Sequence, residues 1–137
     1  MPILNSVYRQ RAAGRPLTDL RLYEEAGGYR ALTTALGDMQ PDELLYQLQR
    51  SGLRGRGGAG FPTGRKASFL PKDSALPSYV VCNADESEPG TFKDRELMEL
   101  NPFQLLEGMT LAGYAIGAHR GYLYVRGEYE TQARVLD

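Results

Sequence analysis

The order of two short segments rich in aliphatic and aromatic residues around one long apolar helix constrains the fold most. Residues 78–82 and 122–125 are rich in Val, Leu and Tyr and predict short strands, the first of them buried. Residues 102–116 carry a broad apolar face and stop at Gly117, which predicts a helix. Another helix is predicted over 128–136. Strand, helix, strand, helix at this spacing predicts an α/β fold with the two strands parallel.

Three short helices are predicted ahead of this unit. Thr18 or Asp19 can cap the first, because both side chains accept hydrogen bonds from the first turn of a helix. Leu32 and Leu36, spaced i, i+4, indicate the second. Pro41 suits the first turn of the third, since its missing N–H has no partner there in any helix.

The ends of the chain predict how its domain is organised. Residues 1–17 lack clear periodicity and predict an extended N-terminal arm, which leaves 18–137 as one domain of ordinary size. The last predicted helix runs to Asp137 without a capping glycine. We therefore expect 18–137 to be the front, incomplete part of a larger domain.

Composition excludes several classes of protein. The formal net charge of −1 gives no general reason to expect a nucleic-acid partner. No apolar run approaches the ~20 residues that cross a bilayer, and the N-terminus lacks a signal-peptide core, so we expect a cytoplasmic protein. The single cysteine, Cys82, cannot form an internal disulfide or hold an iron–sulfur cluster, which needs about four thiolates. We interpret Cys82 as a small buried apolar residue rather than a nucleophile.

The segment from Gly55 to Gly60 places four glycines in six positions. It satisfies G-x-G-x-x-G, but a helix precedes it where a dinucleotide fingerprint needs a strand. A P-loop would need lysine where Arg65 stands. Without side chains, the backbone can approach a flat ligand or a pyrophosphate, and successive N–H groups can bind an anion. A flexible surface loop is the alternative.

A predicted helix and several basic residues lie within or beside this glycine segment. A short helix is predicted over 63–70, which Thr63 could cap. Arg56, Arg65 and Lys66 could reach a bound phosphate, although a solvated basic loop is the simpler interpretation of the charges alone.

An acidic loop follows the first predicted strand, where α/β proteins bind their ligands. Asp85, Glu86 and Glu88 place three carboxylates within four residues, between Asn83 and the turn at Pro89-Gly90. The spacing does not match a calcium loop, and nothing fixes the carboxylate separation that a hydrolase needs. Two interpretations remain. The loop could recognise a flavin ring, a ribityl chain or a ribose, or it could be a solvated turn.

Taken together, three segments resemble one family. They are Ser51 to Gly64, Val81 to Arg95, and Glu107 to Gly117 continued by Gly121 to Tyr129. In order and spacing they resemble the NADH-binding flavoprotein subunit of respiratory complex I, over roughly Gly27 to Glu130. Related proteins are the diaphorase subunits of NAD-reducing hydrogenases and formate dehydrogenases. The resemblance implies a Rossmann-like, parallel-sheet domain that binds FMN and NADH.

The resemblance also implies roles for individual residues. Side chains and backbone of the two loops would bind FMN or NADH. Phe61 and Phe69 would stack on the adenine, and Glu86 and Glu88 would be the nearest residues to tune the flavin. The residues concerned are Gly55, Arg56, Gly57, Gly58, Ala59, Gly60, Phe61, Lys66, Phe69, Asn83, Asp85, Glu86, Ser87 and Glu88. No residue is expected to act as a catalytic acid or base, and no metal site is expected, because FMN carries out the hydride transfer.

At the level of the whole protein, the resemblance implies an NADH:quinone oxidoreductase subunit that passes single electrons to iron–sulfur clusters. The family's 4Fe-4S cysteines are absent from these residues, so we expect no dehydrogenase activity from these 137 residues alone. Implied partners are other peripheral-arm subunits, especially a 2Fe-2S thioredoxin-like subunit and a large iron–sulfur subunit, on the cytoplasmic side of the inner membrane. A diaphorase module, or a non-catalytic nucleotide-binding paralogue, is the alternative. Arg65 and Ala67 depart from the leucine and tryptophan common in the family.

Overall fold

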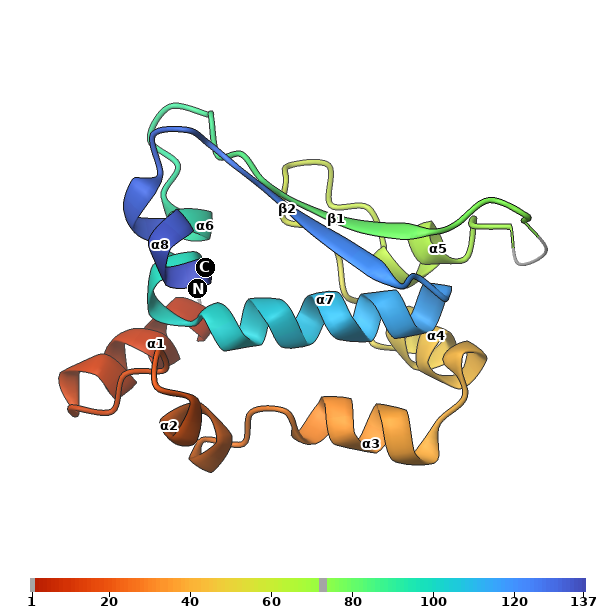
Figure 1. The fold of residues 1–137 in the computed structure, drawn as a ribbon, viewed down its shortest axis with the longest axis horizontal. Coiled ribbons are helices and arrows are strands. Elements are labelled where there is room, and N and C mark those ends of the chain that lie inside the picture. The colour runs from red at the N-terminus through yellow and green to blue at the C-terminus, as the bar shows by residue number, and fades with distance from the viewer. Residues whose placement is uncertain (1, 72–73) are drawn as a thin grey trace.

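The computed structural model describes residues 2–71 and 74–137, and within them the chain forms eight helices and two strands (Figure 1). The elements are α1 (Pro2–Ala12), α2 (Leu20–Glu25), α3 (Arg30–Asp38), α4 (Pro41–Arg50), α5 (Thr63–Ala67), β1 (Tyr79–Ala84), α6 (Lys93–Leu100), α7 (Pro102–Ile116), β2 (Arg120–Val125) and α8 (Glu130–Leu136). The predicted α/β class is confirmed.

The two strands pair in parallel, as predicted, with Tyr79 opposite Arg120 and Ala84 opposite Val125. Helix α7 runs beneath them and packs against both (Figure 1). Contact is close where Gly121 meets Met109: a β-carbon at Gly121 would lie 3.1 Å from the Met109 methyl. Because both strands run the same way, their carboxyl ends meet at one edge, near α6 and α8.

The prediction that the first strand is buried is wrong for one of its faces. Alternate residues of β1 and β2 point away from α7, and Val81 and Tyr124 on that face are 63% and 62% exposed. A strand buried on both faces needs a layer on each side. Here α7 is the helix that packs on the strands, and it covers one face.

The prediction of an extended arm over residues 1–17 is also wrong, because residues 2–12 form α1. Val7 and Leu17 are buried in a cluster with Tyr23 and Leu100. Leu100 ends α6, which packs against α1 and lies far away in sequence. The helix thus depends on a distant apolar surface, which local periodicity does not reveal.

Several predicted helix boundaries are confirmed. Asp19 caps α2, its Oδ1 accepting a hydrogen bond from the Leu22 N–H at 3.1 Å. Pro41 opens α4, and α7 covers 102–116 as predicted. The helix predicted over 63–70 is shorter, ending at Ala67, and its N-cap position is Pro62, so the interpretation of Thr63 as a cap is wrong. Among the described residues, none of the helices combines the length and apolar character that crossing a membrane requires.

Candidate functional site

The glycine segment is a loop whose base is closed by backbone hydrogen bonds. The Gly55 N–H donates to the Phe61 carbonyl at 2.9 Å, and the Thr63 N–H donates to the Leu53 carbonyl at 2.8 Å. Arg54 adds a bond from Nη1 to the Gly60 carbonyl at 3.0 Å. These contacts hold both ends of the loop, which favours a constrained loop over a flexible one.

The tip of this loop is open to a ligand. Gly58 and Gly60 have φ of +102° and +61°, the left-handed region that favours glycine. A β-carbon at Gly57, Gly58 or Gly60 would meet nothing within 4 Å. Among the described residues, no hydrogen bond uses the backbone N–H groups of residues 56–60. Donors so placed, with Arg56 and Lys66 exposed beside them, suit a phosphate or another anion.

Two aromatic rings stand beside the loop. The ring centroids of Phe61 and Phe69 lie 6.1 Å apart at an interplanar angle of 55°, and the side chains are 42% and 65% exposed. The Arg65 guanidinium lies 6.0 Å and 5.9 Å from the two centroids. Exposed aromatic faces of this kind can stack on a flat base.

The acidic loop leaves β1 at the carboxyl edge of the sheet, as the sequence predicted. Asn83 Oδ1 accepts a hydrogen bond from the Asp85 N–H at 3.1 Å, and Ser87 Oγ donates to Asp85 Oδ1 at 2.6 Å. Asn83, Asp85, Ser87 and Glu88 are exposed. Their carboxylate, amide and hydroxyl groups can accept hydrogen bonds from a polyhydroxyl or ring N–H ligand.

Glu86 differs from its neighbours because it is only 3% exposed. Its carboxylate accepts hydrogen bonds from the Asp94 N–H at 2.8 Å and the Arg95 N–H at 3.3 Å, in the first turn of α6. The carboxylate therefore caps the N-terminus of α6, where its negative charge interacts favourably with the helix dipole and stabilises the helix. Its role towards a ligand stays a prediction.

Sequence reasoning missed two residues that hold this loop. Arg126 Nη1 donates to the Glu86 carbonyl at 3.1 Å, and the Tyr129 hydroxyl donates to the same carbonyl at 3.3 Å. Both follow β2, whose carboxyl end lies beside that of β1. The predicted parallel pairing points to the end of β2, but finding these two residues also requires the register of the strands.

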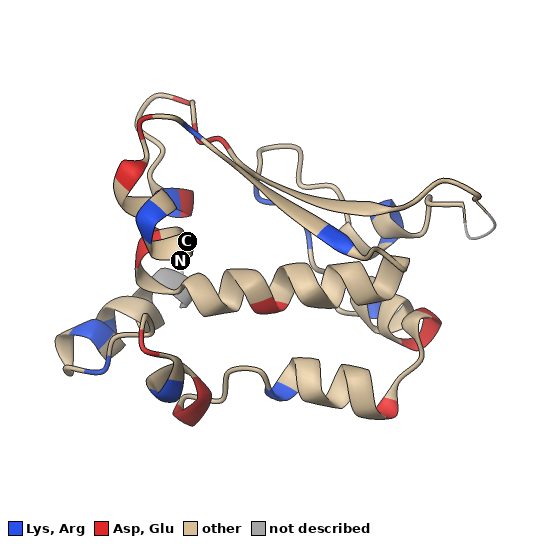
Figure 2. Cartoon of the chain, viewed as in Figure 1, with Lys and Arg blue, Asp and Glu red and all other residues tan. Residues whose placement is uncertain are grey.

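The two loops share one side of the molecule. Figure 1 shows both on the side of α7 that carries the strands, opposite α2 and α3. Figure 2 shows basic residues on the glycine loop and α5, and acidic residues gathered where the strands end. A ligand with an anionic end and a donor-rich ring would find a complementary partner at each loop.

Other features of the described surface lie elsewhere. A broad hollow lined by Tyr46, Leu76 and His119, among others, lies at the opposite end of the strands and includes none of the predicted site residues. Burial raises the pKa of the Cys82 thiol, and the nearby Asp94 carboxylate raises it further, which disfavours the thiolate. Within the described residues, no group of three or more His, Cys, Asp and Glu side chains could hold a metal ion.

Fold and loops together define a class of protein: an α/β unit with open backbone N–H groups on one loop and exposed carboxylates on the other. Comparison with known proteins identifies the family. The Nuo51 FMN-binding domain family matches residues 48–137. An F subunit of NADH-quinone oxidoreductase, the one numbered 2 in Rhizobium meliloti (strain 1021), is 58% identical over 118 residues. The corresponding F subunit of Aquifex aeolicus (strain VF5) is 54% identical over 114 residues. The chain belongs to the family of the Nuo51 FMN-binding domain.

These matches cover much of this chain but little of the relatives. They span 86% and 83% of the chain, but 28% and 26% of the two proteins from Rhizobium and Aquifex. Among solved structures, an NAD⁺-reducing [NiFe]-hydrogenase in the air-oxidized state matches with a TM-score of 0.66 and 50% identity, over 71% of this chain and 17% of the other. The same type of hydrogenase in the H₂-reduced state gives a TM-score of 0.68 and 48% identity, over 76% and 18%.

Proposed function

We propose that this chain forms the glycine-loop and acidic-loop side of an FMN and NADH site, in the front part of a Rossmann-like domain of an NADH dehydrogenase flavoprotein subunit. The observation that carries the proposal is the open backbone of residues 56–60, on the same side of α7 as the acidic loop. The match to an FMN-binding domain family supports it. We propose that the residues from 18 onwards belong to that domain, with α1 packed against its helix α6.

The FMN phosphate fits the glycine loop. The N–H groups of Gly57 to Gly60 are open to it, and Arg56 and Lys66 add positive charge beside them. At the other loop, Asn83 and Asp85 offer acceptors to the flavin ring and ribityl hydroxyls. Each side chain fits the chemical group that it would contact.

NADH fits the outer side of the same site. Phe61 and Phe69 would stack on the adenine, and Glu88 and Ser87 would accept hydrogen bonds from ribose hydroxyls. A close approach of the dinucleotide over Gly58 needs the absence of a side chain there.

The residues of the chain position the reactants and supply no acid or base. FMN, when bound, supplies a ring that accepts a hydride and releases electrons singly. The buried Glu86 and the exposed Glu88 would be the nearest residues to tune the electron affinity of that ring. Electrons would leave to iron–sulfur clusters held by residues other than these 137.

We place the protein among the peripheral-arm subunits of complex I, on the cytoplasmic side of the membrane, beside a 2Fe-2S thioredoxin-like subunit and a large iron–sulfur subunit. One observation favours a second candidate. Two hydrogenase structures match at 50% and 48% identity, so a diaphorase module of an NAD-linked hydrogenase would present the same two loops.

The test is a titration of the purified chain with FMN, followed by NADH. We expect flavin fluorescence to be quenched on binding, and the visible absorbance to bleach with NADH once the rest of the domain is present. Gly57→Ala is the matched variant, because its new methyl group enters open space and should obstruct the ligand without disturbing packing. Tight NADH binding with no flavin binding would contradict the proposal and favour a nucleotide-binding paralogue.

A further inference from the structure

One arginine joins the acidic loop to the end of β2. Arg126, the first residue after that strand, uses all three guanidinium nitrogens, two of them towards the acidic loop. Nη1 donates to the Glu86 carbonyl at 3.1 Å, Nη2 donates to Glu128 Oε1 at 3.2 Å, and Nε lies 3.7 Å from Asp85 Oδ1. The Tyr129 ring supports the guanidinium at 5.8 Å. Figure 1 shows the two connections together at the upper left of the molecule.

We propose that Arg126 is a positioning residue, which fixes the backbone of the acidic loop so that Asp85, Ser87 and Glu88 face the ligand. This inference rests on the proposed function, because it names what holds one half of that site. Arg126 would act through the loop and not through direct contact with FMN or NADH.

The charges explain why a cation is needed here. Asp85, Glu86, Glu88 and Glu128 bring four carboxylates to the carboxyl edge of a two-stranded sheet. Like charges so close repel one another, and each would favour a conformation that separates them. Arg126 pairs with Asp85 and Glu128, while the N–H groups of α6 hold Glu86. Glu88 remains exposed and available to a ligand.

The geometry explains why the cation is arginine. The contacts to a carbonyl and to two separate carboxylates come from different nitrogens of one planar group. A lysine ammonium is a point charge without that fixed fork, so it can keep the charge but lose the simultaneous contacts. Arg126 therefore sets both the local charge and the shape of the loop.

The contacts of Arg126 also distinguish its loop-positioning role from a role in binding phosphate. Its nitrogens are directed to groups of the chain itself, whereas Arg56 and Lys66 stand exposed beside the open glycine loop. Loss of Arg126 should therefore change the acidic loop before any ligand is added. That expectation can be measured on the chain alone.

Amide hydrogen exchange tests the loop-ordering role directly. In Arg126→Gln we expect the amides of Asp85, Asp94 and Arg95, which donate to Asn83 and to Glu86, to exchange at least about tenfold faster than in the unchanged chain, with α7 unaffected. Arg126→Lys should recover only part of the protection. Arg134→Gln is the matched control, because Arg134 also pairs with a glutamate, Glu130 at 3.2 Å, but on the exposed face of α8. Equal exchange in all four chains would overturn the inference.

FMN titration and the flavin midpoint potential then test what the loop order does. We expect Arg126→Gln to weaken FMN binding by about tenfold and to shift the potential, with Arg126→Lys intermediate and Arg134→Gln unchanged. Unaltered affinity and potential in Arg126→Gln, despite faster exchange, would also overturn the inference. If the unchanged chain fails to bind FMN, the proposed function is contradicted. The hydrogen-exchange result would still decide whether Arg126 orders the loop. Glu128→Gln is a second variant, for use if Arg126→Gln fails to fold. It removes one partner of Arg126 but leaves the arginine in place.

Discussion

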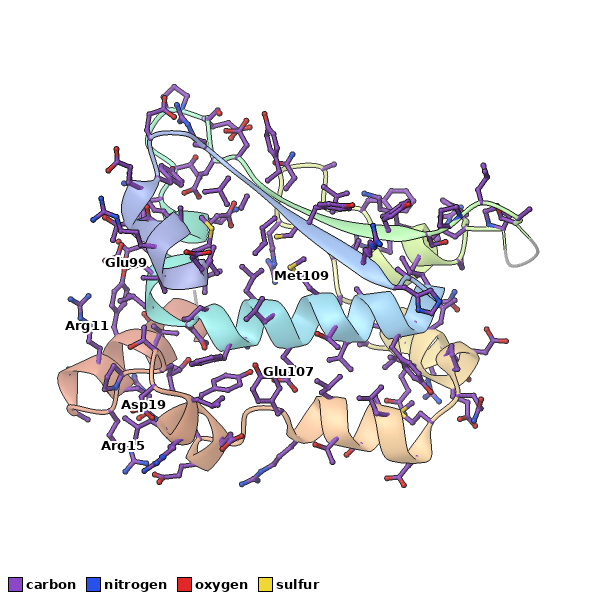
Figure 3. The ribbon with its side chains drawn as sticks, viewed as in Figure 1. Arg11, Arg15, Asp19, Glu99, Glu107 and Met109 are labelled. Carbon is purple, nitrogen blue, oxygen red and sulfur yellow. The ribbon has the colours of Figure 1, made fainter. Side chains whose placement is uncertain are left out.

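Tyr23 and Glu107, 84 positions apart in sequence, are joined by a hydrogen bond from the Tyr23 hydroxyl to the Glu107 carboxylate in the protein interior. The same carboxylate accepts the Tyr29 N–H at 3.0 Å and the Leu32 N–H at 3.2 Å. Figure 3 shows Glu107 pointing from α7 towards α2 and α3. One buried carboxylate, 8% exposed, thus ties the turn between two short helices to the central helix.

We expect Tyr23→Phe to lower the free energy of unfolding by about 1.5–3 kcal/mol, the range for a hydrogen bond to a charged group. The ring and its contacts with Tyr29 and Phe103 would remain, so the loss would report on the hydroxyl. Urea denaturation of the chain measures it. Tyr8→Phe is the matched control, since Tyr8 donates to Glu96 at the exposed surface and should change stability much less than Tyr23→Phe.

Stability should fall at alkaline pH, partly because of Tyr23. Burial raises the pKa of the Tyr23 hydroxyl above its ordinary 10.0, and its hydrogen bond to Glu107 raises it further. The folded chain therefore holds this proton more tightly than the unfolded chain. The contribution is complete below pH 10.0 and is lost as pH rises towards the folded pKa. Denaturation midpoints of the unchanged chain and of Tyr23→Phe should thus converge above pH 10.0; parallel curves would contradict the assignment.

Gly64→Ala should destabilise the contact between α4 and α5. A β-carbon at Gly64 would lie 2.5 Å from the Gln49 nitrogen and 2.8 Å from its α-carbon, and both are backbone atoms that cannot move aside cheaply. We expect a loss of about 1–3 kcal/mol in unfolding free energy. Gly57→Ala adds the same methyl group to open space and should leave stability nearly unchanged. Equal stability of the two variants would show that the close approach is not needed.

Cys82 should react slowly with alkylating reagents. Its thiol pKa is raised by burial and by the charge of Asp94, so less thiolate is present near neutral pH. Iodoacetamide labelling followed by mass spectrometry should be several-fold slower in the folded chain than in urea. Labelling at the denatured rate would contradict the partial burial of this thiol.

The sequence predicted the elements whose signals are local. Asp19 and Pro41 mark helix starts through side-chain chemistry that acts within one turn, and the strands flanking α7 are short β-branched runs. It failed where distant residues decide the structure. α1 needs the apolar surface of α6, and the α6 N-terminus is held by Glu86 through the N–H groups of Asp94 and Arg95.

The candidate site shows the same division. The open backbone at Gly57 to Gly60 follows from composition, because only glycine leaves that space. The burial of Glu86 does not follow from its sequence, since three neighbouring carboxylates look alike until α6 and Arg126 are placed around one of them. Arg126 itself acts across the pairing of β1 with β2, which becomes informative only when the register is known.

The most direct test is a map of backbone amide NMR shifts as FMN is added to the chain. We predict that the shifts that change most will belong to two segments, residues 55–60 and 83–88, and that both will saturate at the same FMN concentration. Saturation at different concentrations, or changes confined to the hollow around Tyr46 and His119, would contradict a single flavin site shared by the two loops.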